Sequence, residues 1–200
     1  MSIQIAIIRG IPVIQENDGR VHWTSGGAID ADGANGQNGN DFAYRADNKG
    51  LDNYANAGWP HGGWRNVLID HGDGSPSSDG HGNWYSSTTY SWHGRPLATR
   101  FVDSTAVPYA VVNPIVRRNA AGVVIGCRAR ITYKGNSIEA VVADVSGSGD
   151  IGELSIAAAQ ALGFKHTSPR NGGVASGVSF EFWPGHAAQI GGEIYDLQRA

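Results

Sequence analysis

Two acidic residues flank a glycine-rich turn late in the chain, in a setting suited to acid–base catalysis. Asp144 closes an apolar run that predicts a strand over residues 137–145. Glu153 follows the turn and precedes a run of helix-forming residues, which predicts a helix over residues 154–162 that ends at Gly163. Glu153 is therefore expected at or beside the N-terminus of this helix.

Hydrolysis of a glycosidic bond requires two carboxyl groups in different environments. One must be protonated to release the leaving oxygen, and the other must be ionised to activate water. Burial and mutual repulsion can separate the pKa values of two acids that face one cleft. The spacing alone leaves another interpretation open, in which Glu153 only interacts with the helix dipole and Asp144 only caps the turn.

A second acidic pair, Asp30 and Asp32, lies in the N-terminal part of the chain. Alternate residues of an extended backbone point to the same face, so both carboxylates could bind one ammonium group, such as the amine of a glucosamine unit. Calcium is an alternative ligand, but Gly33, Ala34 and Asn35 break the ligand order of an EF-hand loop. A solvated loop without a ligand is the third interpretation.

Aromatic residues are concentrated between positions 59 and 92, where they could form the wall of a polysaccharide groove. Trp84 and Tyr85 are predicted to contact sugar, and Thr88 with its hydroxyl-bearing neighbours is predicted to supply hydrogen bonds near the carboxylates. The alternative is that these tryptophans only anchor loops to the rest of the fold.

The segment 71–82 contains two His and two Asp, a composition that also occurs in zinc sites. No predicted helix fixes the geometry between His71 and His81, so a surface loop is the preferred interpretation. The single cysteine, Cys127, cannot form an internal disulfide and is expected to be a small core residue.

Arg128 and Arg130 alternate on one face of a predicted strand and are expected to pair with Glu139 or Asp144 across the sheet. A salt bridge to Asp144 would keep that carboxylate ionised. Glu153 would then be the protonated partner.

The composition indicates one compact domain over residues 1–200. Its 40% hydrophobic residues, 29 Gly and 8 Pro suit short strands joined by shaped loops. The formal net charge of −3 gives no polyanion-binding signature, so nucleic acid is not expected as a partner. The N-terminal apolar patch is too short to span a membrane and has no positive residue before it, so neither a membrane segment nor a signal peptide is expected.

Turn residues and apolar runs divide the chain into short elements. One or two strands are predicted within residues 3–14, a loop over residues 28–40 and a short helical turn over residues 51–57. Candidate barrel strands follow at 64–70, 97–102, 107–113, 123–131, 138–145 and 178–183.

Four segments together carry a resemblance to a known family: residues 85–90, 106–114, 133–136 and 143–163. In this order, the chain resembles the fungal-type endo-chitosanases of glycoside hydrolase family 75 over about residues 29–163. In that family, an Asp at the end of a strand and a Glu at the following helix start are the catalytic carboxylates. By the resemblance, these correspond to Asp144 and Glu153.

The segment around these acids is also similar to the signature of double-psi β-barrels, including expansins, family 45 glucanases and lytic transglycosylases. The resemblance implies a mainly β fold: a six-stranded double-psi β-barrel with long loops and one or two short helices. It also implies an inverting endo-chitosanase that acts outside the cell, with Glu153 as general acid, Asp144 as general base, and no cofactor or metal.

We expect chitosan as the polysaccharide partner of a monomeric enzyme. Two alternatives stay open. One is a peptidoglycan-cleaving lytic transglycosylase or muramidase on the same barrel, and the other is a non-catalytic carbohydrate-binding barrel of the expansin type.

Overall fold

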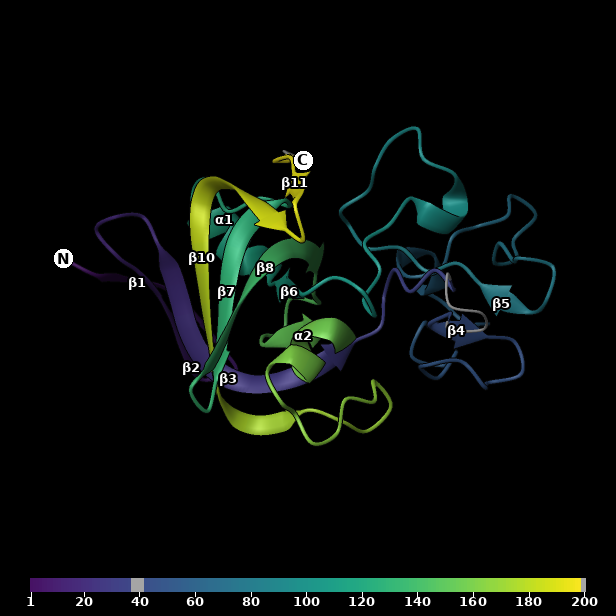
Figure 1. Cartoon of the computed structure of the whole chain (residues 1–200), viewed down its shortest axis with the longest axis horizontal. Coiled ribbons are helices and arrows are strands. Elements are labelled where there is room, and N and C mark those ends of the chain that lie inside the picture. Colours follow the sequence, from purple (N-terminus) through teal and green to yellow (C-terminus); the bar gives the residue numbers. More distant parts are fainter. Residues whose placement is uncertain (37–41, 199–200) are drawn as a thin grey trace.

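The computed structural model describes residues 1–36 and 42–198 and shows a mainly β protein with two short α-helices. Two regions are visible in Figure 1, a β-barrel and a lobe of long loops that extends from one side of it. The loop lobe comprises the described chain between residues 42 and 105.

Six strands form the closed barrel in the order β3-β9-β6-β8-β7-β10, and the pairing of β10 with β3 closes it. The pairs β3–β9 and β6–β8 are parallel, and the other neighbours in the barrel are antiparallel. The predicted six-stranded barrel is therefore confirmed, and its double-psi connectivity stays a prediction. The barrel strands are β3 (Val21–Asp30), β6 (Tyr109–Val112), β7 (Cys127–Tyr133), β8 (Asn136–Val145), β9 (Glu153–Ser155) and β10 (Val174–Ile190).

The remaining elements extend the sheet or lie at its ends. β1 and β2 form a hairpin that continues the sheet beyond β3, and β11 pairs with the end of β10. Their bounds, with those of the helices and the lobe strands, are β1 (Ile3–Ile8), β2 (Ile11–Gln15), β4 (Tyr44–Arg45), β5 (Asn83–Trp84), β11 (Glu193–Tyr195), α1 (Pro114–Asn119), α2 (Ile156–Ala161) and the 3₁₀-helices η1 (Trp64–Asn66) and η2 (Leu97–Thr99).

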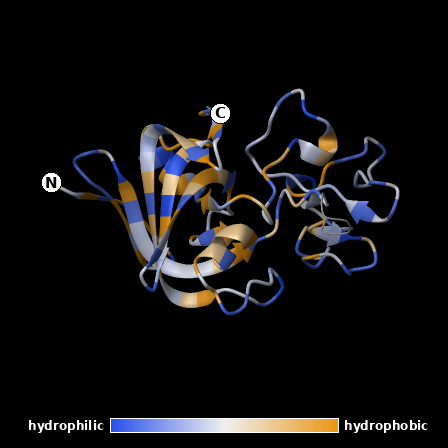
Figure 2. Ribbon diagram, in the orientation of Figure 1, coloured by the Kyte–Doolittle hydropathy of each residue, from blue (hydrophilic) through white to orange (hydrophobic). Residues whose placement is uncertain are grey.

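Alternation along the strands fills the barrel with apolar side chains. In β3, every second residue from Val21 to Ile29 is buried and the residues between them face outward. Trp23 stacks on Phe180 with ring centroids 5.2 Å apart and meets Phe182 edge-on at 4.8 Å. Orange and blue segments accordingly alternate along the barrel strands in Figure 2. Burial of these large side chains supplies most of the driving force for closing the barrel.

Two of the predicted barrel strands are wrong, because their segments lie in the loop lobe, where each begins with a 3₁₀-helix and continues with isolated β-bridges only. Segment 64–70 begins with η1, where Trp64 and Leu68 are buried four residues apart and the Leu68 N–H donates to the Trp64 carbonyl at 2.7 Å. Segment 97–102 begins with η2. The apolar residues that resembled strand alternation are thus spaced for a helical turn.

The short helical turn predicted before Gly58 is present, because the N–H groups of Asn56, Ala57 and Gly58 each donate to the carbonyl oxygen three residues earlier. The long strand β3 was not predicted. The predicted strands at 107–113, 138–145 and 178–183 are confirmed as β6, β8 and part of β10. Among the described residues, no helix has the length and apolar character needed to cross a membrane.

Hydrogen bonds from several segments attach the loop lobe to the barrel. The Tyr90 N–H donates to the Ala143 carbonyl at 2.8 Å, directly before Asp144 in β8. The Arg170 guanidinium, from the loop that follows α2, donates to the carbonyl oxygens of Asn48 and Gly50 at 2.7 and 3.0 Å. The lobe is thereby held against the barrel edge that carries the acidic residues.

Candidate active site

Asp144 lies near the end of β8 and is almost fully buried, with 7% of its surface exposed. Its Oδ1 accepts hydrogen bonds from the Thr89 N–H at 3.1 Å, the Thr89 hydroxyl at 2.7 Å and the Val145 N–H at 2.7 Å. Burial raises the pKa of Asp144 to about 6, although these three hydrogen bonds favour the charged form. The side chain is fixed in position and titrates close to neutrality.

The sequence predicted Glu153 at or beside the start of a helix. In the structure, Glu153 is instead the first residue of strand β9. The helix begins later because Ser155 is its N-cap, with the Ser155 hydroxyl accepting the Ala158 N–H at 3.1 Å. Burial raises the pKa of Glu153 to about 7, and the negative charge of Asp30 adds to the shift. Glu153 therefore retains its proton up to near-neutral pH.

The two predicted catalytic acids lie on either side of strand β6. Val111 is the register partner of Asp144 in β8, and the pairing of Ala110 with Leu154 places Val111 beside Glu153 in β9. Two strand spacings of about 4.8 Å separate their Cα atoms by roughly 9–10 Å. A register shift in β8 directly precedes Asp144, and the charge of Glu153 contributes to the raised pKa of Asp144, so the two carboxyl groups lie close enough for their charges to interact.

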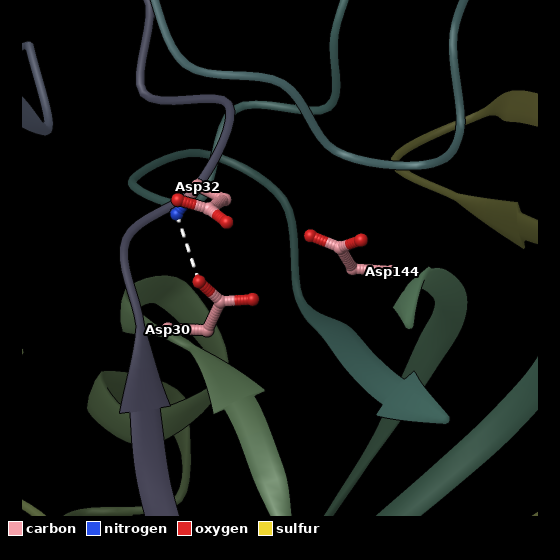
Figure 3. A group of neighbouring side chains, drawn as sticks. All are labelled: Asp30, Asp32 and Asp144. Atoms are coloured by element: carbon pink, nitrogen blue, oxygen red, sulfur yellow. Dashed lines mark hydrogen bonds between the residues drawn. The ribbon is translucent and has the colours of Figure 1, made fainter. Parts of the chain in front are cut away.

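Asp30 and Asp32 lie beside Asp144, as Figure 3 shows. Asp30 is the last residue of β3, and one carboxylate oxygen from each of Asp30, Asp32 and Asp144 lies within 4.8 Å of the others. The backbone N–H of Asp32 donates to Asp30 Oδ1 at 2.9 Å, which fixes the Asp30 side chain against the backbone of Asp32. Asp32 lies in the turn that follows β3, so this turn brings the two carboxylates together, and not the extended alternation that the sequence predicted.

Two buried tyrosines support the cluster of Asp30, Asp32 and Asp144, hereafter the aspartate cluster. The Tyr44 hydroxyl donates to Asp32 Oδ1 at 3.2 Å, and the Tyr109 hydroxyl donates to the Asp32 carbonyl oxygen at 3.1 Å. Burial, and then repulsion by Asp144, raises the pKa of Asp30 to about 7. Burial and the neighbouring carboxylates raise the pKa of Asp32 well above its usual range.

Carboxyl groups this close cannot all be ionised at neutral pH without a cation between them. The aspartate cluster could accommodate an ammonium group or a hard divalent cation such as Ca²⁺, which prefers carboxylate oxygens and takes six to eight oxygen ligands. Within the described chain, it is the one group of His, Cys, Asp and Glu side chains close enough to hold a metal ion. His71 and His81 are both exposed and belong to no such group.

Thr88, predicted to face the carboxylates, is a structural residue of the loop lobe. It is 2% exposed, its hydroxyl donates to the Tyr90 carbonyl at 2.8 Å and accepts the Val102 N–H at 3.0 Å. The next residue, Thr89, is the one that bonds Asp144. The hydroxyl that bonds the Asp144 carboxylate is therefore that of Thr89, one residue after the predicted Thr88.

Trp84 and Tyr85 are packed within the loop lobe. Trp84 is 9% exposed and meets Trp59 edge-on, with ring centroids 5.4 Å apart. Tyr85 is half-buried and meets Phe42 edge-on at 5.0 Å. Trp84 thus anchors the loops, as the alternative interpretation proposed.

Arg128 and Arg130 both pair with Glu139, at 2.6 and 2.8 Å, and not with Asp144. Asp144 is consequently held by hydrogen bonds instead of a salt bridge. The prediction that both arginines pair with an acid across the sheet is confirmed for Glu139. The register of β7 against β8 selects this partner, because it places Arg130 opposite Glu139.

No protein-family model and no curated protein matches the chain. The chemistry of the acidic site therefore carries the functional assignment.

Proposed function

We propose that the protein is an endo-chitosanase that hydrolyses β-1,4 bonds between glucosamine units with inversion of configuration. The observation that carries the proposal is the placement of Asp144 and Glu153, two carboxyl groups with raised pKa values, across a single strand. Inverting glycosidases place their two carboxyl groups about 6.5–9.5 Å apart, which leaves room for a water molecule. The intervening strand separates the Cα atoms of the two acids by roughly 9–10 Å, which leaves room for a water molecule if their side chains project in parallel.

The environments of the two acids favour different roles. Glu153, with a pKa of about 7, is suited to donate its proton to the leaving glycosidic oxygen. Asp144 has the lower pKa of about 6, and its three hydrogen bonds stabilise the carboxylate that takes a proton from the attacking water. The water oxygen bonds to the anomeric carbon as the glycosidic bond breaks. After each turnover, Asp144 releases the proton that it took from water, and Glu153 takes up a proton to replace the one that it donated.

The aspartate cluster supports glucosamine over an uncharged sugar as the substrate unit. Its raised pKa values show that negative charge is unfavourable there without a counterion. A substrate ammonium group would supply that counterion through charge-assisted hydrogen bonds to Asp30 and Asp32. The resemblance to glycoside hydrolase family 75 supports the same substrate.

A comparison of substrates tests this proposal. Reducing-end release by the wild-type protein would be measured side by side on chitosan, cellulose and purified peptidoglycan. We expect release from chitosan and none above background from cellulose, because cellulose offers no ammonium group to the cluster. Release from peptidoglycan alone would replace the proposal with the cell-wall alternative, and release from none of the three would leave the barrel without this hydrolytic function.

A further inference from the structure

Two arginines on helix α1 differ from the other arginines of the described chain. Nine of the eleven arginines in residues 1–36 and 42–198 pair with a carboxylate or donate to a carbonyl oxygen. Arg117 and Arg118, in the last turn of α1, are the two for which no ion pair or side-chain hydrogen bond exists within these residues. The helix dipole favours basic residues in a last turn. It does not explain why two arginines stand next to each other here without a partner among these residues.

Both arginines line a pocket of about 530 Å³. Figure 1 shows α1, the bend of β10 and the C-terminal segment together at one end of the barrel, and the pocket lies among these three segments. Its other lining residues are small or apolar: Pro114, Gly122, Val123, Val124, Gly185 and Leu197. No acidic side chain is part of this lining.

Charge and shape together indicate the class of ligand. Two guanidinium groups offer forked N–H donors that match carboxylate, sulfate and phosphate oxygens, and the remaining wall is apolar. The volume falls within the range of about 300–1,000 Å³ that is typical of small-molecule sites. A glucosamine ammonium group would be repelled, so the pocket cannot be an extension of a chitosan-binding surface.

We propose that this pocket binds a small organic anion. Its anionic oxygen group would bind Arg117 and Arg118, and its apolar body would pack against Val123, Val124 and Leu197. The site is separate from the acidic site and does not depend on the function proposed for that site.

Titration of the full-length protein with the fluorescent sulfonate 8-anilinonaphthalene-1-sulfonate tests the proposal. At pH 7 we expect saturable binding with a stoichiometry of one, displaced by inorganic sulfate. The neutral analogue N-phenyl-1-naphthylamine should bind at least tenfold more weakly, because it lacks the anionic group. The double variant R117Q/R118Q should weaken sulfonate binding at least tenfold, whereas R65Q/R128Q, which removes the same charge elsewhere, should bind within twofold of the wild type.

A second variant keeps the test decisive if R117Q/R118Q does not fold. Val124→Trp fills the pocket without altering its charge, and it should abolish sulfonate binding while circular dichroism shows a native barrel. The proposal is overturned if the sulfonate binds R117Q/R118Q or Val124→Trp as tightly as the wild type. Equal affinity for the neutral analogue would also overturn it, since the arginines would then have no part in recognition.

Discussion

Replacing Asp30 by Asn should stabilise the fold at neutral and higher pH. The substitution keeps the shape of the side chain, and the amide oxygen can still accept the Asp32 N–H. In the folded protein, burial and neighbouring carboxylates raise the pKa of Asp30 from its ordinary value of 3.8 to about 7. Ionisation of this residue therefore favours the unfolded chain, and the wild type loses stability as the pH rises from about 4 to about 7.

The magnitude follows from the size of that shift. Each pKa unit corresponds to about 1.4 kcal/mol, so a rise of roughly three units sets an upper bound of about 4 kcal/mol. The Asp30 side chain is only half-buried, and screening by water reduces the expected gain to about 1–2 kcal/mol. For a chain of this length, that gain raises Tm by roughly 3–6 °C.

Thermal unfolding followed by calorimetry at pH 4, 5.5, 7 and 8 measures the effect. The variant and the wild type should differ least at pH 4, where Asp30 is neutral in the folded protein and about half ionised in the unfolded chain, and separate progressively up to pH 8. Glu139→Gln is the matched control, because hydrogen bonds from Arg128 and Arg130 lower the pKa of Glu139 and its removal should stabilise nothing. A Tm for Asp30→Asn at or below that of the wild type at pH 8 would refute the argument that burial strains the aspartate cluster.

Three further outcomes follow from the same site. NMR of the earliest chitosan product should show inverted anomeric configuration, and retained configuration would contradict the inverting mechanism proposed for Asp144 and Glu153. The double variant D30N/D32N should raise KM on chitosan and reduce the salt dependence of kcat/KM, because it removes the salt-screened attraction between the carboxylates and the substrate amines. Normal kinetics at low and high salt would show that neither residue binds substrate. Arg170→Ala should lower the free energy of unfolding by about 1–3 kcal/mol in urea titrations, because the carbonyl oxygens of Asn48 and Gly50 lose their donor. An unchanged urea midpoint would show that this contact does not hold the loop lobe against the barrel.

Local sequence signals predicted strand β8 and most of helix α2, the two elements on either side of the turn between Asp144 and Glu153. Strand β8 is an apolar run bounded by turn residues, and both features are local. Helix α2 was predicted with Gly163 after its end, where the glycine has a φ of 76°. The start of the helix was placed too early, because the register pairing of Glu153 with Ala28 in β3 extends β9 and was not readable from the segment itself.

Strand β3 and its terminal Asp30 show what local signals cannot give. Gly26 and Gly27 made this stretch resemble a loop, but both positions are tightly packed in the barrel. A Cβ on Gly26 would lie 2.8 Å from the Val174 carbonyl oxygen, and one on Gly27 would lie 2.9 Å from the Phe164 ring. The glycines therefore permit close approach of distant segments, which no short window of sequence reports.

The residues that complete the site come from elements distant in the chain. Thr89 reaches Asp144 from the loop lobe, and Tyr44 and Tyr109 reach Asp32 from the lobe and the barrel. A partial signal existed for Tyr109, since a tyrosine within a buried apolar strand requires a partner for its hydroxyl. The identity of that partner depends on tertiary packing.

The most direct test of the central claim is the turnover of chitosan by Glu153→Gln and Asp144→Asn, measured beside Glu139→Gln. Glu139 is a matched control because it lies on β8 with Asp144 but pairs with arginines on the barrel surface. The two site variants should each lose roughly 10²–10⁴-fold in kcat with native circular dichroism, because each removes one proton carrier of nearly unchanged shape. Glu139→Gln should retain wild-type turnover. More than about a tenth of wild-type kcat in either site variant would contradict the assignment of Glu153 and Asp144 as the catalytic pair.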